Sequence, residues 1–402
     1  MNYPAEMNLE QYSREAQTEF ESILSYWMNY TLDEENGGFY GHINTLNQVT
    51  HQAEKGLVLH ARILWSFSAA YTYTQENKYA QIAERAYQYL IQHFKDEPFG
   101  GFYWSVDYLG QPFQERKQIY GQAFVVYALC EYYQCSQDAA ALDQAIQLFT
   151  WLEKCGQDLE NGGYWEAFSR DWQIIEDVRL SEKDANEKKS MNTHLHVLEA
   201  YTNLYRVWPD EKLGLQIEKL LHLYQTRLIE PTHYYQHLFM DENWVVKSNI
   251  ISYGHDIEAS WLIWEAAEAL GKTHLQEAIK PFVLGLAKTA LKGIAQDGGM
   301  NYELHLETNH LDTDKHSWVQ AEAAVGFLNA YQITGDQTYL VQSWKSWQFL
   351  QKYIVDHQNG EWHWGVTDTY QNMNDVKVGF WKCPYHSTRA CLEVLSRIKE
   401  IS

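Results

Sequence analysis

The sequence predicts an all-α fold, an (α/α)6 barrel of twelve helices with short β-hairpin loops at one end, in a single domain spanning residues 1–402. Three observations predict it. A glycine–aromatic loop returns at regular intervals, two helical segments separate successive copies, and the two helices of each pair differ in charge. No linker divides the chain, and its hydrophobic content of 45% is sufficient for one large core.

The loop is a Gly-Gly pair, reduced to a single Gly in the last copy, after Asn, Asp or Phe and followed by aromatic residues, a pattern typical of a tight turn that feeds a short strand. Successive copies begin about 62 residues apart, but the interval between the third and fourth is about twice as long. We therefore expect a sixth, degenerate copy near residues 241–248. The five clear copies are NGGFYGHI (36–43), FGGFYWSV (99–106), NGGYWEAF (161–168), DGGMNYEL (297–304) and NGEWHWGV (359–366).

The second helix of each pair starts with a polar residue and often an alanine, as in His60–Ala61 and Gln122–Ala123, and carries little charge. A helix that is hydrophobic nearly all round is an inner helix, whereas its amphipathic partner faces solvent. Six such pairs can close into a ring, and we prefer this to an open solenoid because neither end shows a polar capping repeat. The charged segment 178–190 lacks apolar periodicity, and we expect it to lie over a pocket.

Composition narrows the class of partner. A net charge of −22 argues against nucleic acid or an anionic membrane surface, and no apolar run reaches the ~20 residues of a membrane span. The polar N-terminus shows no signal peptide, and the five scattered cysteines have no CxxC spacing, so we expect a cytoplasmic protein without a disulfide framework. The 16 Trp and 29 Tyr favour a carbohydrate ligand.

Parallel inner helices bring their N-termini to one end of the barrel, so polar residues there are candidates for a site. Residues two apart on a helix point about 200° apart, so His194 and His196 cannot face the same cavity. Residues three or four apart share a face, which pairs Asn192 with His196 and His255 with Glu258. We expect His194 to pack between helices. The polar residues at these positions are His60, Arg62, Tyr120, Gln122, Asn192, His194, His196, His255, Glu258, Trp318, Gln320, Glu322, Tyr385, His386 and Arg389.

Three histidines at one end of a ring allow several chemistries. A three-histidine zinc site is one, although no carboxylate stands at an orienting spacing. A glycosidase would need two carboxyl groups, from Asp184, Glu258 or Glu322, and would leave the histidines without a role. A sugar-binding module would not need several bases. Proton transfer at a sugar carbon next to a carbonyl uses all three imidazoles, with Arg62 and Asn192 to stabilise an enediolate and no metal or redox cofactor.

Three motifs carry a family resemblance that extends over essentially the whole chain. Residues 189–210, 252–266 and 379–394, the last containing KCPYH-x-x-RAC around His386, resemble the cellobiose 2-epimerase branch of the N-acylglucosamine 2-epimerase superfamily. The resemblance implies reversible epimerisation at C2 of the reducing-end sugar of β-1,4-linked disaccharides such as cellobiose, lactose or mannobiose. The alternatives within the superfamily are an N-acylglucosamine 2-epimerase and a mannose isomerase.

The resemblance also implies roles for residues. His255 and His386 correspond to the paired acid and base, and His196 to a third histidine that assists ring opening or the enediolate. We expect a disaccharide as the small-molecule partner, no cofactor, and a monomer or weak homodimer. Ser317 stands where relatives often carry a tryptophan before Trp318, which predicts a smaller stacking surface. The implied substrate contacts are Arg62, Tyr120, Asp184, Asn192, Glu258, Trp318 and Trp381.

Overall fold

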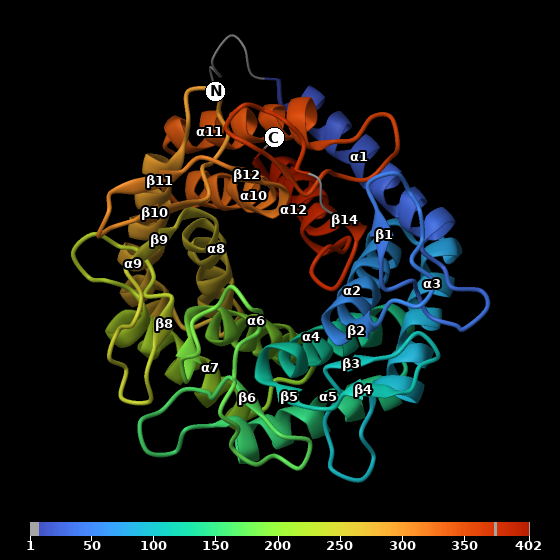
Figure 1. Cartoon of the computed structure of the whole chain (residues 1–402). Coiled ribbons are helices and arrows are strands. Elements are labelled where there is room, and N and C mark those ends of the chain that lie inside the picture. Colours follow the sequence, from blue (N-terminus) through green and yellow to red (C-terminus); the bar gives the residue numbers. More distant parts are fainter. Residues whose placement is uncertain (1–7, 374–375, 402) are drawn as a thin grey trace.

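The computed structural model describes residues 8–373 and 376–401, and within them twelve α-helices alternate between an outer and an inner ring (Figure 1). The predicted (α/α)6 barrel is confirmed. The inner helices are α2 (Leu57–Thr74), α4 (Ile119–Ser136), α6 (Met191–Val207), α8 (Tyr253–Ala269), α10 (Ser317–Thr334) and α12 (Tyr385–Ile401). The outer helices are α1 (Leu9–Tyr30), α3 (Asn77–Tyr89), α5 (Ala139–Trp151), α7 (Glu211–Leu223), α9 (Thr273–Ala290) and α11 (Gln337–Phe349).

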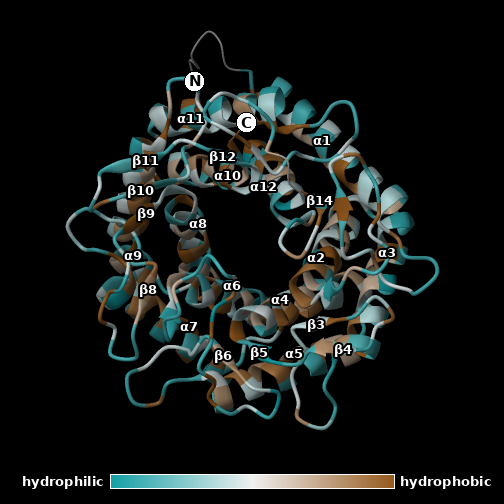
Figure 2. Ribbon diagram, viewed as in Figure 1, coloured by the Kyte–Doolittle hydropathy of each residue, from teal (hydrophilic) through white to brown (hydrophobic). Residues whose placement is uncertain are grey.

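The inner helices form a closed ring. Each contacts the next, and α12 packs against α2, while α1 from the start of the chain packs on α12. Closure leaves the inner helices little solvent contact: every residue of α2 from Leu57 to Ala70 is buried. Figure 2 shows apolar residues gathered on the helices and polar ones along the projecting loops. An open solenoid is therefore ruled out.

Short strands lie at the end where the inner helices begin, since several of them run directly into an inner helix. Within the described residues they form six small antiparallel sheets, in the orders β2–β3–β4, β5–β6, β7–β8, β9–β10–β11, β12–β13 and β1–β14, the last joining an early strand to a late one. The strands are β1 (Ile43–Asn44), β2 (Lys55–Gly56), β3 (Ser105–Val106), β4 (Pro112–Gln114), β5 (Lys117–Gln118), β6 (Ala167–Phe168), β7 (Lys189–Ser190), β8 (Phe239–Met240), β9 (Ile250–Ser252), β10 (Glu303–His305), β11 (His310–Asp312), β12 (Lys315–His316), β13 (Gly365–Val366) and β14 (Val376–Val378).

The glycine–aromatic loops follow the outer helices, five of which end in a short turn of π or 3-10 helix. In each repeat an isolated bridge closes the loop, for example between Lys95 and Phe102. The prediction for the sixth copy was wrong: the equivalent bridge joins Ile229 to Gln236, and residues 241–248 belong to the following hairpin. The repeated feature is a left-handed backbone turn, which Tyr234 adopts at φ 55° without a glycine. The short turns are η1 (Leu90–Phe94), η2 (Leu152–Gly156), η3 (Tyr224–Leu228), η4 (Leu291–Gly293) and η5 (Leu350–Ile354).

Buried ion pairs tie these loops to the inner helices. In four repeats a lysine near the inner-helix start donates to an aspartate of the loop, and both side chains are almost completely buried. Because a buried charge without its partner is costly, each pair holds the helix start against the loop. The pairs are Lys55–Asp33 (2.8 Å), Lys117–Asp96 (2.8 Å), Lys189–Asp158 (2.7 Å) and Lys377–Asp356 (2.8 Å).

Among the described helices, none is both long and apolar enough to cross a membrane. The charged segment predicted to be irregular over 178–190 carries no helix or strand up to residue 188, but residues 189–190 form β7. Residues 178–180, 184–185 and 187 line a pocket at the strand-bearing end.

Candidate active site

In α4, α6, α8 and α10 the fourth residue of the helix accepts a hydrogen bond from the backbone of the neighbouring loop. Gln122 in α4 accepts from the backbone N–H of Phe102 and donates to its carbonyl, both at 2.8 Å. His194 in α6 holds its loop through an imidazole. Its Nε2 accepts from the N–H of Tyr164 at 2.9 Å, and its Nδ1 lies 2.7 Å from the carbonyl oxygen of Ser190. His194 is completely buried. His194 is therefore a packing residue, as predicted, but it packs against loop residues such as Tyr164 and Trp244 rather than between helices.

His196, two residues later, points instead into the ring and is paired with a carboxylate. Its Nδ1 lies 2.8 Å from Oε2 of Glu199, one turn further along α6. Burial opposes ionisation of Glu199, but the Arg389 guanidinium and the bond from His196 hold its pKa below the usual value. An ionised carboxylate can only accept, so Nδ1 carries the proton and Nε2 keeps its lone pair.

His386, at the start of α12, forms a second pair of the same kind. Its Nδ1 lies 2.7 Å from Oε1 of Glu322 in α10. Although burial opposes it, the positive charge of Arg389 lowers the pKa of Glu322 well below its usual value, so this carboxylate also accepts. The pKa of His386 itself is lowered to about 4, mainly by burial. His386 is therefore neutral at pH 7, with Nε2 unprotonated.

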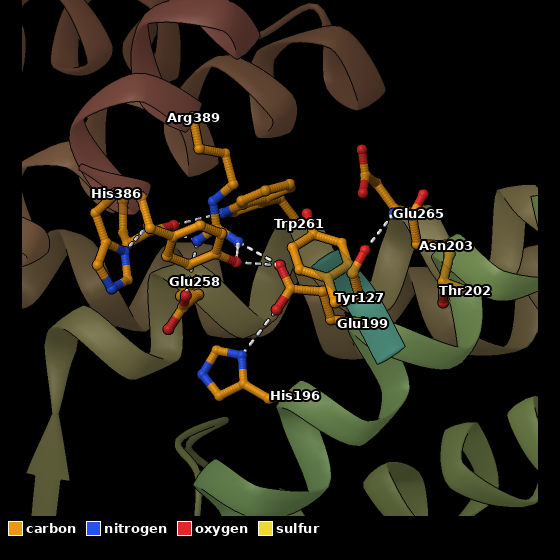
Figure 3. Close-up of polar contacts among 12 residues, drawn as sticks. Tyr127, His196, Glu199, Thr202, Asn203, Glu258, Trp261, Glu265, His386 and Arg389 are labelled. Carbon is orange, nitrogen blue, oxygen red and sulfur yellow. Dashed lines mark hydrogen bonds and ion pairs between the residues drawn. The ribbon is translucent and has the colours of Figure 1, made fainter. Parts of the chain in front are cut away.

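One buried cation joins the two pairs. Arg389 donates from Nη1 to Glu199 and from Nη2 to Glu322 at 2.7 Å and Glu258 at 2.8 Å (Figure 3). Burial and the neighbouring Glu322 raise the pKa of Glu258 to about 8. Glu199 is not among the residues predicted from the sequence, and Arg389 was predicted only as a polar residue at a helix start. Glu199 could have been found, because it stands three residues after His196 on the same helix face.

The same cluster contains three groups, among residues 8–373 and 376–401, that lie close enough together to hold a metal ion. Ligand atoms of Glu258, Glu322 and His386 lie within 4.8 Å of one another. However, Nη2 of Arg389 donates to both carboxylates, so a positive group already occupies the position between them. The donor set consequently fits the arginine better than a metal ion.

His255, in the first turn of α8, has a different environment. Its Nδ1 lies 2.8 Å from Oγ of Ser252, and no carboxylate in the described part of the chain pairs with it. Burial, followed by the imidazoles of His196 and His386, lowers its pKa to about 3. The Trp318 ring lies 4.7 Å from the ring of His255 and 5.7 Å from that of His386. Trp318 thus brings together His255 and His386 from α8 and α12, and His196 of α6 lies close enough to His255 to help lower its pKa.

Arg62 in α2 is a second buried guanidinium, but it has no carboxylate partner among the described residues. Nη2 donates to the hydroxyl of Tyr120 at 2.7 Å, and Nη1 lies 3.9 Å from Sγ of Cys383. The guanidinium carbon of Arg62 lies 4.2 Å from the ring centre of Phe124. A cation that is 3% exposed and unpaired has its full charge available for an anionic ligand.

The remaining predicted residues surround this centre. Asn192, Asp184 and His255 line the pocket under segment 178–188, together with Glu166 and Tyr302. Asp184 accepts from the N–H and Oγ–H of Ser181 at 2.8 and 2.9 Å, which fixes that segment locally. The ring of Tyr120 lies 4.9 Å from that of His196 and 5.8 Å from that of Trp381. All ten predicted site residues thus lie at one end of the barrel.

Known proteins resemble the whole chain. Residues 37–390 match the family model described as N-acylglucosamine 2-epimerase. A cellobiose 2-epimerase from Bacteroides fragilis is 47% identical, covering 93% of this chain and 95% of that one. Another from Dictyoglomus turgidum is 38% identical over 94% and 96%. The solved structure of cellobiose 2-epimerase from Bacillus thermoamylovorans has a TM-score of 0.93 at 40% identity, covering 96% of this chain and 100% of that one.

Proposed function

The chain belongs to the N-acylglucosamine 2-epimerase family, and we propose that it is an isomerase that reversibly epimerises C2 of the reducing-end glucose or mannose of β-1,4-linked disaccharides such as cellobiose, lactose and mannobiose. The observation that carries the proposal is the meeting of three neutral imidazoles from α6, α8 and α12 beside an unpaired buried arginine. Inverting a carbon next to a carbonyl needs bases on two sides and a cation for the intermediate.

His255 and His386 are the proposed acid and base. Once the sugar ring has opened, one neutral imidazole removes the C2 proton and becomes an imidazolium. The other imidazole, which first takes up a proton from solvent, returns that proton to the opposite face of the planar enediolate, and both exchange with solvent before the next turnover. Both ring systems contact Trp318, which places them around one volume. Burial lowers the pKa values of both imidazoles, so either one is available as the base at neutral pH, and either gives up a proton readily once it has taken one up. Glu322 stabilises the imidazolium that forms on His386.

The enediolate and the open-chain carbonyl need separate support. Arg62 carries a charge that no carboxylate neutralises, so it can stabilise the developing oxyanion, with the Asn192 amide beside the pocket. His196 keeps a free Nε2 because Glu199 holds Nδ1, and it is the proposed proton carrier for ring opening. Glu258, held by Arg389, orients a sugar hydroxyl.

The second sugar ring of the disaccharide is expected toward the pocket mouth. Trp318 and Trp381 are the proposed stacking platforms, and Asp184 on segment 178–188 is the proposed contact from above. We also propose a cytoplasmic protein, in keeping with its five free cysteines, acting without a metal or cofactor as a monomer or weak homodimer.

Incubation with cellobiose in D2O tests the proposal. We expect glucosyl-mannose carrying deuterium at C2, and epimer without label would refute the two-base mechanism. His255→Ala and His386→Ala should each abolish epimerisation while circular dichroism stays unchanged, and activity within tenfold of wild type would contradict their roles. Release of monosaccharides would instead indicate a glycosidase. Turnover of mannose alone, with fructose as product, would indicate a mannose isomerase, which returns the proton at C1.

A further inference from the structure

A buried tryptophan completes the hydrogen bonding of the carboxylate behind His386. Trp261 lies in the middle of α8, is 1% exposed, and donates from Nε1 to Oε2 of Glu322 at 3.0 Å. The other oxygen of Glu322, Oε1, accepts from His386 and from Arg389, each at 2.7 Å. Trp261 therefore holds the one carboxylate oxygen that neither the histidine nor the arginine holds.

The indole is itself held by two arginines of α12. The guanidinium carbon of Arg389 lies 4.7 Å from its ring centre, and that of Arg397 lies 5.8 Å away. These arginines are eight residues apart, so both lie on the helix face turned toward α8. Arg397 is fixed in turn by Glu393 at 2.9 Å and by Asn329 at 2.9 Å. The ring cannot turn without displacing both cations.

We propose that Trp261 is a positioning residue for His386, which sets the orientation of the Glu322 carboxylate and through it the tautomer of the imidazole. The inference rests on the proposed function. The terminal torsion of a glutamate is broad, so two donors on one oxygen leave the carboxylate free to rock. A third donor on the other oxygen fixes its plane. Nδ1–H of His386 then has one aligned acceptor, and Nε2 is left as the base.

Loss of the indole N–H would leave Oε2 of Glu322 buried without a donor, and the carboxylate would rotate to share the remaining donors. The Nδ1–H tautomer of His386 would no longer be favoured, and the alternative tautomer carries its proton on Nε2 and cannot accept one. If Trp261 only filled space in the core, replacing it with phenylalanine would change kcat little, because phenylalanine fills most of the same space and lacks only the N–H donor.

The test compares two variants of the full chain. Trp261→Phe removes the donor to Glu322. Trp347→Phe is the matched control, because Trp347 is completely buried in α11 and also donates to a carboxylate at 3.0 Å, that of Glu15, far from the histidines in the fold. For Trp261→Phe we expect kcat on cellobiose to fall about 10- to 100-fold, a part of the ~10²–10⁴ that acid–base catalysis supplies. KM should stay within twofold.

The second readout is the NMR signals of the two ring nitrogens of His386, which are identified by their absence from the spectrum of His386→Gln. Wild type and Trp347→Phe should show one tautomer with the proton on Nδ1, whereas Trp261→Phe should show a mixture. An unchanged spectrum and kcat within twofold for Trp261→Phe would overturn the inference, as would an equal loss of kcat in both variants. If the wild type fails to exchange the C2 proton, the proposed function fails, while the spectrum still decides the role of Trp261.

Discussion

His194 and His196 stand two residues apart on α6, and substituting each of them in turn should separate an effect on stability from an effect on catalysis. His194→Ala leaves the buried N–H of Tyr164 without an acceptor, which costs ~1–3 kcal/mol, and opens a cavity, so we expect about 3 to 5 kcal/mol in total. An unfolding entropy of roughly 2 cal/mol/K per residue converts this to a thermal midpoint about 4 to 6 °C lower. Epimerase activity at 25 °C should change little.

A conservative variant sharpens this prediction. Gln122 and Gln320 occupy the equivalent position in other repeats, where the amide both accepts from and donates to one loop residue. His194→Gln should therefore recover most of the lost stability, to within about 1 kcal/mol of wild type. The same change at His196, which turns its ring toward Tyr120, should instead lower kcat about 10²-fold with the thermal midpoint nearly unchanged.

Thermal unfolding and initial rates on cellobiose measure both effects. A midpoint lowered as much by His196→Gln as by His194→Ala would contradict the separate roles of the two histidines. So would a complete loss of turnover in a folded His194→Ala chain.

Three further outcomes are expected. The acid limb of kcat/KM should lie below pH 6.5, because burial lowers the pKa values of His255 and His386 to about 3 and 4. The free energy of unfolding should also fall as the pH drops below 6.5, because the unfolded chain then binds protons that the folded chain does not. Arg62→Gln should lower kcat about 10²-fold at nearly constant KM in steady-state assays, and a change in KM alone would contradict its role at the oxyanion. Lys189→Met should cost ~3–5 kcal/mol in urea unfolding, since Asp158 stays buried without its partner, and Lys189→Met with Asp158→Asn should recover part of this.

The barrel could be predicted because its pattern is repeated in the chain itself. Inner and outer helices alternate in charge, and the glycine loops mark each turn of the ring, so helix count and order follow from spacing. The position of the sixth loop was not predicted correctly, because the copies share a backbone conformation rather than a residue type. Tyr234 takes a left-handed φ where other copies have glycine, and the tertiary contacts of the ring compensate for that strain.

The histidines and their helix faces were also accessible from the sequence, because spacing along one helix determines which side chains share a face. Of their carboxylate partners, only Glu199 shares a helix with its histidine, His196, and could have been found from spacing, whereas Glu322 could not. Glu199 and Glu322 come from different helices and meet only through Arg389 of a third, and Trp261 reaches Glu322 from a fourth. Contacts between side chains far apart in the chain depend on how the helices close into the ring. The amino-acid sequence by itself thus determined the scaffold and the candidate bases, whereas only the packing of distant helices decided which nitrogen of His386 carries the proton.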